Sequence, residues 1–290
     1  MRKFSFLSML SVLCLAINGC GDGTGTLKQD AALAADTYVA LDLERNVVEP
    51  VGSSISPDHA RYRTTHVLFR RIPAGTGQTG TDGDLTQSGE SASDTTVVTY
   101  REFFCAVFEL TQAQWERLTG TAPWTSTIYA GAFNDVAQAT GATLPAWGMS
   151  YDQAATAAAS VRPVDWRVAL PTTVQWEIAA RAGNLRTPFS WSGRVTDLPL
   201  ARTFAAFSEA GTTAPLPRAV GGDRRANAWG IFDTVGNIGE FATPASGSLA
   251  DVCGGAYDQP LIVCRLSNVL PVERDLGHPA FGVRLILVRP

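Results

Sequence analysis

Apolar, β-branched and aromatic residues gather in two stretches that are typical of strands, His66–Phe69 and Thr96–Phe108. Three other segments begin as helices do, because a Thr or Ser is followed three residues later by Gln, the capping-box pattern. These pairs are Thr111/Gln114, Ser150/Gln153 and Thr172/Gln175. Gly120 and Gly183 are expected to end the first and third helices, since glycine readily adopts the left-handed conformation of a helix terminus. Short helices among short strands predict an α+β fold.

The pattern at the amino terminus is that of a targeting signal. Two basic residues precede an apolar run, Phe4–Ile17, which is too short to span a bilayer as a folded helix. The following Ile17-Asn18-Gly19-Cys20 resembles the lipobox of bacterial lipoproteins, which implies cleavage before Cys20 and lipidation of its thiol. We therefore expect a signal peptide over 1–19 and a bacterial lipoprotein anchored by acyl chains on the exported side of a membrane. The alternative is an ordinary cleaved signal that releases the protein.

The remainder divides into a tether and one domain. Residues 20–60 start with a Gly-rich stretch and show little periodicity, apart from a short segment at Tyr38–Leu43 that could be ordered. They are expected to form a flexible tether. Residues 61–290 contain no second linker of this kind, so we predict a single domain with a polar insertion at Thr76–Thr95.

Composition and charge limit the classes of function. Hydrophobic residues make up 45% of the chain, which is enough for a substantial core. The 27 acidic against 23 basic side chains give a net charge of −4. A nucleic-acid partner is not expected, because such proteins usually present a basic face to the phosphates. The 27 Gly and 16 Pro favour a fold rich in loops over a helical bundle.

Several common chemical motifs are absent or incomplete. Gly75–Gly80 matches the G-x-G-x-x-G pattern, but no helix signal follows it, and a dinucleotide site needs that helix. The three histidines, His59, His66 and His278, lack the spacing of a zinc site. The sequence also has no G-x-S-x-G elbow and no P-loop.

A series of ordered motifs spans most of Arg61–Pro290. They are IPAGT at Ile72–Thr76, FFCAVFELTQAQW at Phe103–Trp115, LPTTVQWEIAARAG at Leu170–Gly183, NAWGIFDTVGNIGEF at Asn227–Phe241, GGAY at Gly254–Tyr257, CR at Cys264–Arg265 and GVRL at Gly282–Leu285. In the same order they resemble the motifs of the formylglycine-generating enzyme (sulfatase-modifying factor) superfamily. The resemblance implies a C-type-lectin-like α+β fold with short strands, few short helices and long loops.

The resemblance also locates the family's copper site, in which two Cys bind Cu(I) and activate oxygen to oxidise a sulfatase Cys. Cys264 matches the second of these Cys, whereas the first falls on Gln259. A carboxamide cannot replace a copper thiolate, because Cu(I) selects soft sulfur ligands. The family's neighbouring Ser, His and Trp positions fall on Ala256, Pro260 and Gly239. We therefore expect neither copper binding nor formylglycine generation.

Three cysteines remain in the predicted domain, an odd number for an oxidising compartment. Cys105 lies in a strand-like segment and is expected to be a buried thiol. Cys264 could form a disulfide with Cys253, since a strand-loop-strand return could bring the two within reach, although Cys105 could compete.

The resemblance further implies a structural Ca²⁺ site. The family segment aligns with Asp233, Gly236, Ile238 and Glu240, which would supply two carboxylates and two backbone carbonyls. The alternative is that the carboxylates cap a turn or pair with Arg224 and Arg225. A second calcium site of the family is not expected, because its first Asn falls near Thr203–Phe204.

Two functions fit these observations. The first is a membrane-tethered binding module that recognises a glycan or another envelope protein. The alternative is an oxygen-dependent modifying enzyme, of the formylglycine-generating type, with an altered site. The replacement of a copper Cys by Gln259 favours the binding module.

Overall fold

The computed structural model describes residues 37–52, 55–80, 95–129, 139–184, 187–191, 196–210 and 216–290. The predicted signal peptide, the predicted lipidation site Cys20 and the first part of the predicted tether lie outside these residues. None of the helices in the described ranges has the length and apolar character needed to cross a membrane.

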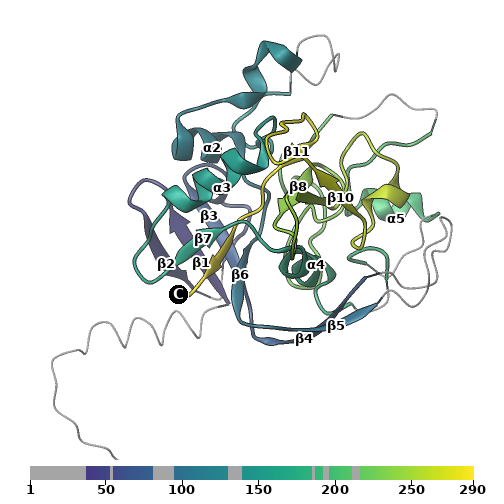
Figure 1. Ribbon diagram of the computed structural model, residues 1–290, viewed down its shortest axis with the longest axis horizontal. Coiled ribbons are helices and arrows are strands. Elements are labelled where there is room, and N and C mark those ends of the chain that lie inside the picture. The colour runs from purple at the N-terminus through teal and green to yellow at the C-terminus, as the bar shows by residue number, and fades with distance from the viewer. Residues whose placement is uncertain are drawn as a thin grey trace, which may run out of the picture. The chain divides into compact units, whose positions relative to one another are not determined.

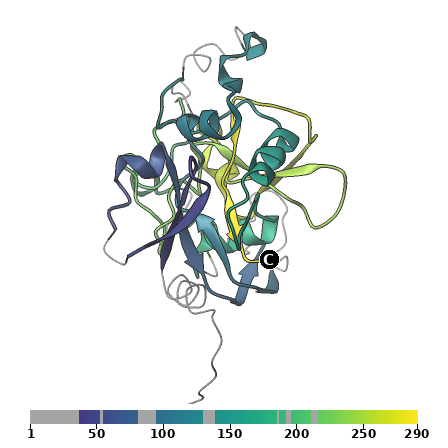
Figure 2. The same ribbon diagram turned by 90° about the vertical axis from the view of Figure 1, so that its left-hand side faces the viewer.

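A six-stranded antiparallel sheet brings the two ends of the domain together (Figure 1). Its strands, in spatial order, are β2 (Val47–Val51), β1 (Tyr38–Asp42), β3 (His66–Ile72), β6 (Phe103–Ala106), β12 (Ile286–Val288) and β7 (Arg167–Ala169). The C-terminal strand β12 pairs with β6 on one side and β7 on the other, and both views show it beside β6 (Figure 2). The C-terminal strand is therefore needed to join the edge strand β7 to the rest of this sheet.

A smaller, four-stranded sheet lies in the C-terminal half. Its order is β10 (Val269–Val272), β9 (Ala250–Cys253), β8 (Gly239–Ala242) and β11 (Phe281–Gly282). The β11 strand runs parallel to β8, and the other pairs are antiparallel. A separate hairpin joins β4 (Gly75–Thr79) to β5 (Thr96–Tyr100).

All three predicted capping boxes are confirmed, and they begin the helices α2 (Gln112–Thr119), α3 (Tyr151–Ser160) and α4 (Thr173–Arg181). A further helix in the described ranges, α5 (Leu198–Arg202), begins at an Asp197 cap. Gly120 ends α2 in the left-handed conformation with φ 67°. The prediction for α4 was one residue late, because its left-handed cap is Ala182, with φ 50°, and not Gly183. In the described ranges, short 3₁₀ helices cover Ala60–Arg63, Pro123–Thr125, Thr127–Tyr129 and Leu261–Cys264.

The core is built largely from residues of the family-like motifs. The whole of β6 is buried, and it packs with Ile178 and Ala179 of α4. A second cluster packs Trp176 and Ala180 of α4 against the aromatic residues Phe189 and Trp191. Helix α4 thus contacts two parts of the core. The mixed architecture confirms the predicted α+β, C-type-lectin-like fold class.

The predicted boundary of the domain needs correction. Residues 20–60 do not form a tether throughout, because β1 and β2 belong to the large sheet and β1 pairs with β3 along its length. The predicted strand Thr96–Phe108 is interrupted at Arg101 and Glu102, which separate β5 from β6. The predicted insertion also begins differently, since its first residues form β4.

We expect a chain that begins at residue 61 to be much less stable than one that begins at residue 36. The shorter chain loses Val39 and Leu41, both fully buried, and burial of each such side chain contributes about 1.5–3 kcal/mol. It also leaves β3 as an unprotected sheet edge. Thermal unfolding of both chains tests this, and equal melting temperatures would show that β1 and β2 are dispensable.

Candidate functional site

The thiol at the position of the second copper Cys is enclosed by backbone carbonyls. Cys264 ends a 3₁₀ helix, and its Sγ lies 3.7 Å from the carbonyl oxygens of Ala256 and Pro260 and 4.0 Å from that of Gln259. Burial raises the pKa of the Cys264 thiol to about 12. The protonated thiol is therefore the stable form, whereas a metal ligand must be the thiolate.

The position of the first copper Cys is occupied by a side chain that stabilises a turn. The Gln259 Oε1 accepts a hydrogen bond from the Ala256 backbone N at 3.1 Å. Gln259 lines a small cavity of about 100 Å³ together with the ten residues Gly239, Val252, Gly255, Ala256, Val263, Asn268, Val269, Leu270, Ala280 and Phe281. None of these lining residues is ionisable. The donor set does not fit Cu(I).

The position of the family's Trp, which is Gly239 here, has no space for a large side chain. Gly239 lies so near β9 that a Cβ placed on it would be 2.6 Å from Val252 Cγ1. A larger side chain therefore requires movement of the neighbouring strand. This departure from the family pattern is built into the packing of β8 on β9.

The predicted disulfide between Cys253 and Cys264 does not form. Both cysteines, and Cys105, are free and buried. Cys264 packs on the backbone of Gly255, where an added Cβ would be 2.6 Å from Sγ. Cys253 instead ends β9, in register with Glu240 and Val269. The prediction of Cys105 as a buried strand thiol is confirmed.

The first predicted calcium ligand, Asp233, forms a buried ion pair. Its Oδ1 accepts a short hydrogen bond from Arg224 Nε, and its Oδ2 accepts one from the Gly221 backbone N at 2.5 Å. The turn that follows is tightly packed, because a Cβ on Gly236 would lie 2.0 Å from the Ala206 carbonyl oxygen. Both carboxylate oxygens of Asp233 thus already have protein donors.

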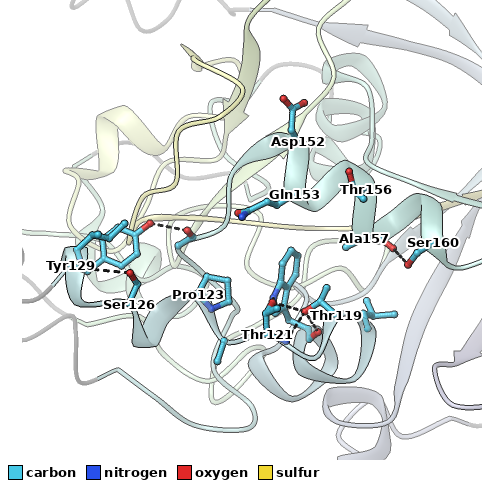
Figure 3. Close-up of a pocket in the computed structure, with 15 residues that line it drawn as sticks. Thr119, Thr121, Pro123, Ser126, Tyr129, Asp152, Gln153, Thr156, Ala157 and Ser160 are labelled. Carbon is cyan, nitrogen blue, oxygen red and sulfur yellow. Dashed lines mark hydrogen bonds between the residues drawn. The ribbon is translucent and has the colours of Figure 1, made fainter.

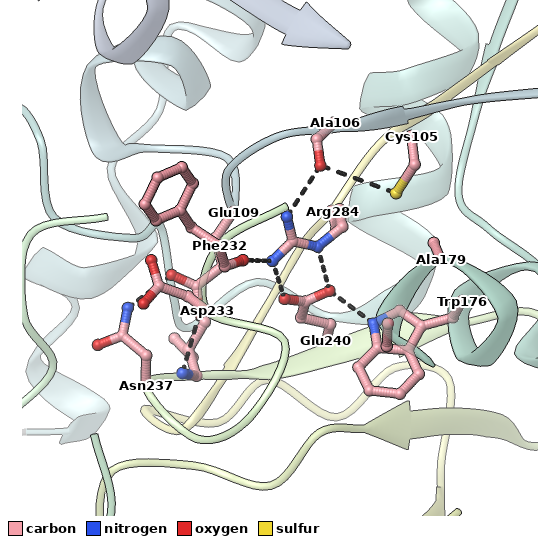
Figure 4. A network of polar contacts seen from close by, with 12 residues as sticks. Cys105, Ala106, Glu109, Trp176, Ala179, Phe232, Asp233, Asn237, Glu240 and Arg284 are labelled. Carbon is pink, nitrogen blue, oxygen red and sulfur yellow. Dashed lines mark hydrogen bonds and ion pairs between the residues drawn. The ribbon is translucent and has the colours of Figure 1, made fainter. Parts of the chain in front are cut away.

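The second predicted carboxylate ligand, Glu240, is bound by an arginine and a tryptophan (Figure 4). Arg284 donates to it from Nε at 2.7 Å and from Nη2 at 2.6 Å. Trp176 Nε1 donates to Oε2 at 2.6 Å. Arg284 also donates to the carbonyl oxygens of Ala106 at 2.9 Å and Phe232 at 2.8 Å. One guanidinium therefore joins β6, β8 and the turn before Asp233.

A third carboxyl group, Glu109, completes this buried polar network. It accepts hydrogen bonds from Asn237 Nδ2 at 2.6 Å and from the Ile238 backbone N at 3.1 Å. Burial, and then the charges of Asp233 and Glu240, raise the pKa of Glu109 well above its usual value. Glu109 and Arg284 lie within the family-like motifs of the sequence, but the local pattern around them predicts no function for either.

As folded, these residues do not fit Ca²⁺. Calcium needs six to eight oxygen ligands, yet the carboxylates of Asp233 and Glu240 are directed at guanidinium groups. The pairing with Arg224 that sequence analysis held as an alternative is the arrangement found. Within the described ranges, no group of three or more His, Cys, Asp or Glu side chains is placed to hold a metal ion.

A much larger hollow than the one beside Gln259 lies between α2 and α3 (Figure 3). We call it the α2–α3 groove. Its volume is about 810 Å³, and its lining is a mixture of apolar and hydroxyl side chains. The lining residues are Trp115, Leu118, Thr119, Thr121, Ala122, Pro123, Ser126, Ile128, Tyr129, Gly148, Asp152, Gln153, Thr156, Ala157 and Ser160. Sequence analysis located the two helices but could not show that they face each other.

We expect Glu240→Gln to lower the free energy of unfolding by about 3–5 kcal/mol, because it leaves the Arg284 charge buried without its partner. The matched control is Glu209→Gln, which breaks the exposed ion pair with Arg202 and should change stability little. Denaturant unfolding measures both variants. Similar losses in the two would show that the buried pair has no special contribution.

We also expect the melting temperature to be the same in Ca²⁺ and in chelator, because the arginines occupy the carboxylates that calcium would need. Mg²⁺ at equal ionic strength is the control for general salt effects. A rise in melting temperature specific to Ca²⁺ would show that the ion displaces these contacts or binds at another position.

Comparison with known proteins agrees with the fold. Residues 55–288 match the model of the sulfatase-modifying factor enzyme 1-like domain. No curated protein sequence matches the chain. Among solved structures, PvdO from Pseudomonas aeruginosa is similar with a TM-score of 0.61 and 18% identity over 76% of this chain and 94% of that one. Treponema denticola variable protein 1 has a TM-score of 0.59 and 19% identity over 78% and 96%. CarF has a TM-score of 0.57 and 18% identity over 76% and 97%. These likenesses show the fold, and the family match shows that the chain belongs to the sulfatase-modifying factor enzyme 1-like family.

Proposed function

We propose that this chain is a binding module of the family, tethered to a membrane by a lipid on Cys20, and that it does not generate formylglycine. The proposal rests on the two residues that occupy the positions of the family's copper Cys. Gln259 stands where the family has a thiol, and its Oε1 accepts from the Ala256 backbone. The remaining thiol, Cys264, is buried against carbonyl oxygens and has a raised pKa. Neither side chain therefore provides the thiolate that Cu(I) binding requires.

The space available supports binding at another place. The cavity beside Gln259, at about 100 Å³, is too small for a peptide substrate, whereas the α2–α3 groove, at about 810 Å³, lies within the usual range of ligand sites. The two hollows share no lining residue. A glycan or another envelope protein is the partner that such a tethered module would recognise.

We expect the purified protein to bind no stoichiometric Cu(I) and to leave a Cys-x-Pro-x-Arg peptide unchanged in mass in the presence of oxygen and a reductant. Copper content and peptide mass are the measurements, and Cys264→Ala is the control. One Cu(I) per chain that is lost in Cys264→Ala, together with conversion of the peptide thiol to an aldehyde, would favour the oxygen-dependent enzyme instead.

Cys20→Ala should remove the membrane-bound, detergent-extractable pool of the protein, because it deletes the thiol at the signal junction. Fractionation of cells that express either form tests this. Cys105→Ala is the control, since that thiol is buried in β6. Unchanged membrane association of the Cys20 variant would contradict the lipid anchor.

A further inference from the structure

We propose that the α2–α3 groove binds a neutral saccharide. The inference rests on the proposed binding function and adds the site and the chemical class of the ligand. Three properties of the groove support it: the hydrogen-bonding state of its hydroxyl groups, a fixed amide donor and the absence of uncommitted charge among its lining residues.

Hydroxyl side chains lie on both walls of the groove. Thr119 and Thr121 belong to the wall formed by α2 and the turn after it, and Thr156 and Ser160 project from α3 (Figure 3). Thr119 Oγ1 donates to the Trp115 carbonyl at 3.0 Å, and Ser160 Oγ donates to that of Ala157 at 2.7 Å. The Ser160 proton is thereby used within α3, and its oxygen presents lone pairs to the groove as an acceptor for a hydroxyl proton of a ligand. The Thr119 oxygen is already occupied, because it also accepts from the Thr121 backbone N at 3.1 Å and lies 2.7 Å from Thr121 Oγ1.

A donor is held in place on the same side as Thr156. Gln153 is the capping-box residue of α3, and its Oε1 accepts from the Ser150 backbone N at 2.9 Å. This bond fixes the orientation of the amide, so that Nε2 carries two N–H groups with no hydrogen-bond acceptor among the described residues. The Thr156 hydroxyl is exposed one turn of the helix away. Fixed donors and acceptors suit a sugar hydroxyl, which both donates and accepts.

Between the polar groups the groove is apolar. Leu118, Ala122, Pro123 and Ala157 line it, and Ile128 is 71% exposed there. The polar atom of Trp115 is directed at Thr121 Oγ1, at 3.0 Å, and the Tyr129 hydroxyl donates to the Gly148 carbonyl at 2.7 Å. Apolar surface interrupted by a few placed polar groups is the usual composition of a small-molecule site. It matches the C–H faces of a sugar ring.

The charge of the groove selects against ionic ligands. Among the described residues that line it, Asp152 alone is charged at neutral pH, and it accepts from Arg274 Nε at 3.0 Å and Nη2 at 2.7 Å. The Arg274 guanidinium also lies over the Tyr151 ring, 4.3 Å from its centroid. In the described part of the lining, no cation is therefore available for a sulfate, phosphate or uronate group, and Asp152 would repel one. A neutral sugar is not repelled by Asp152 and needs no cation.

The test is titration of the protein with neutral gluco-, galacto- and manno-trisaccharides, and with sulfated and uronate-containing trisaccharides, followed by ligand-observed NMR. We expect at least one neutral trisaccharide to bind at least tenfold more tightly than its charged counterparts. Gln153→Glu keeps the capping oxygen but removes the donor, and Thr156→Val removes a hydroxyl without changing shape. Each should weaken binding about tenfold.

Gln175→Glu is the matched control, because Gln175 has the same capping function in α4 and lies outside the groove. It should leave saccharide affinity unchanged. Failure of all neutral trisaccharides to bind, or an equal loss in Gln175→Glu, would overturn the saccharide site. That result, without copper-dependent peptide conversion, would leave the binding module intact, whereas conversion would remove the proposed function itself.

Discussion

The buried ion pair between Glu240 and Arg284 is the interaction on which the rest of the domain depends. Both side chains are 1% exposed, so the cost of removing two charges from water must be offset by well-formed contacts. Arg284 meets this requirement with donors to Glu240 and to the carbonyl groups of Ala106 and Phe232. These partners are 44, 178 and 52 positions away in the sequence. The pair is therefore satisfied only when both sheets and the C-terminal segment have assembled.

The same packing explains why the family's reactive position is closed in this chain. Gly236 fits against the Ala206 carbonyl and Gly239 against Val252, which holds the segment between Asp233 and Glu240 in place. Gly255 packs directly on Cys264, since an added Cβ would lie 2.6 Å from the thiol Sγ. The thiol is thus part of the packed interior. Copper chemistry would need a second sulfur and a stable thiolate, and this interior favours neither.

The α2–α3 groove arises from a different kind of constraint. Its walls are short helices whose first turns are held by capping boxes, and the capping Gln153 of α3 also faces the groove. Because Gln153 is held by its cap, its amide is available as an oriented hydrogen-bond donor at the surface of the groove. The interior and the groove are separate, since the network around Arg284 contributes no lining residue to the groove. A substitution that changes the groove therefore need not alter the buried network of this chain.

The sequence by itself determined the features that depend on contacts between residues close together in the chain. Capping boxes depend on residues three apart, and all three formed where the pattern placed them. The ordered motifs determined the family and the α+β class. Tertiary structure decided the rest. A carboxylate such as Asp233 or Glu240 is equally suited to a cation or to an arginine, and only the fold brought Arg224 and Arg284 to them. Likewise, Cys253 and Cys264 are close in sequence and belong to one core cluster, yet the fold leaves both as free thiols, one in the register of β9 and the other against Gly255. The start of the domain and the groove were decided in the same way, because strand pairing and the facing of two helices are contacts between distant segments, which local pattern does not encode.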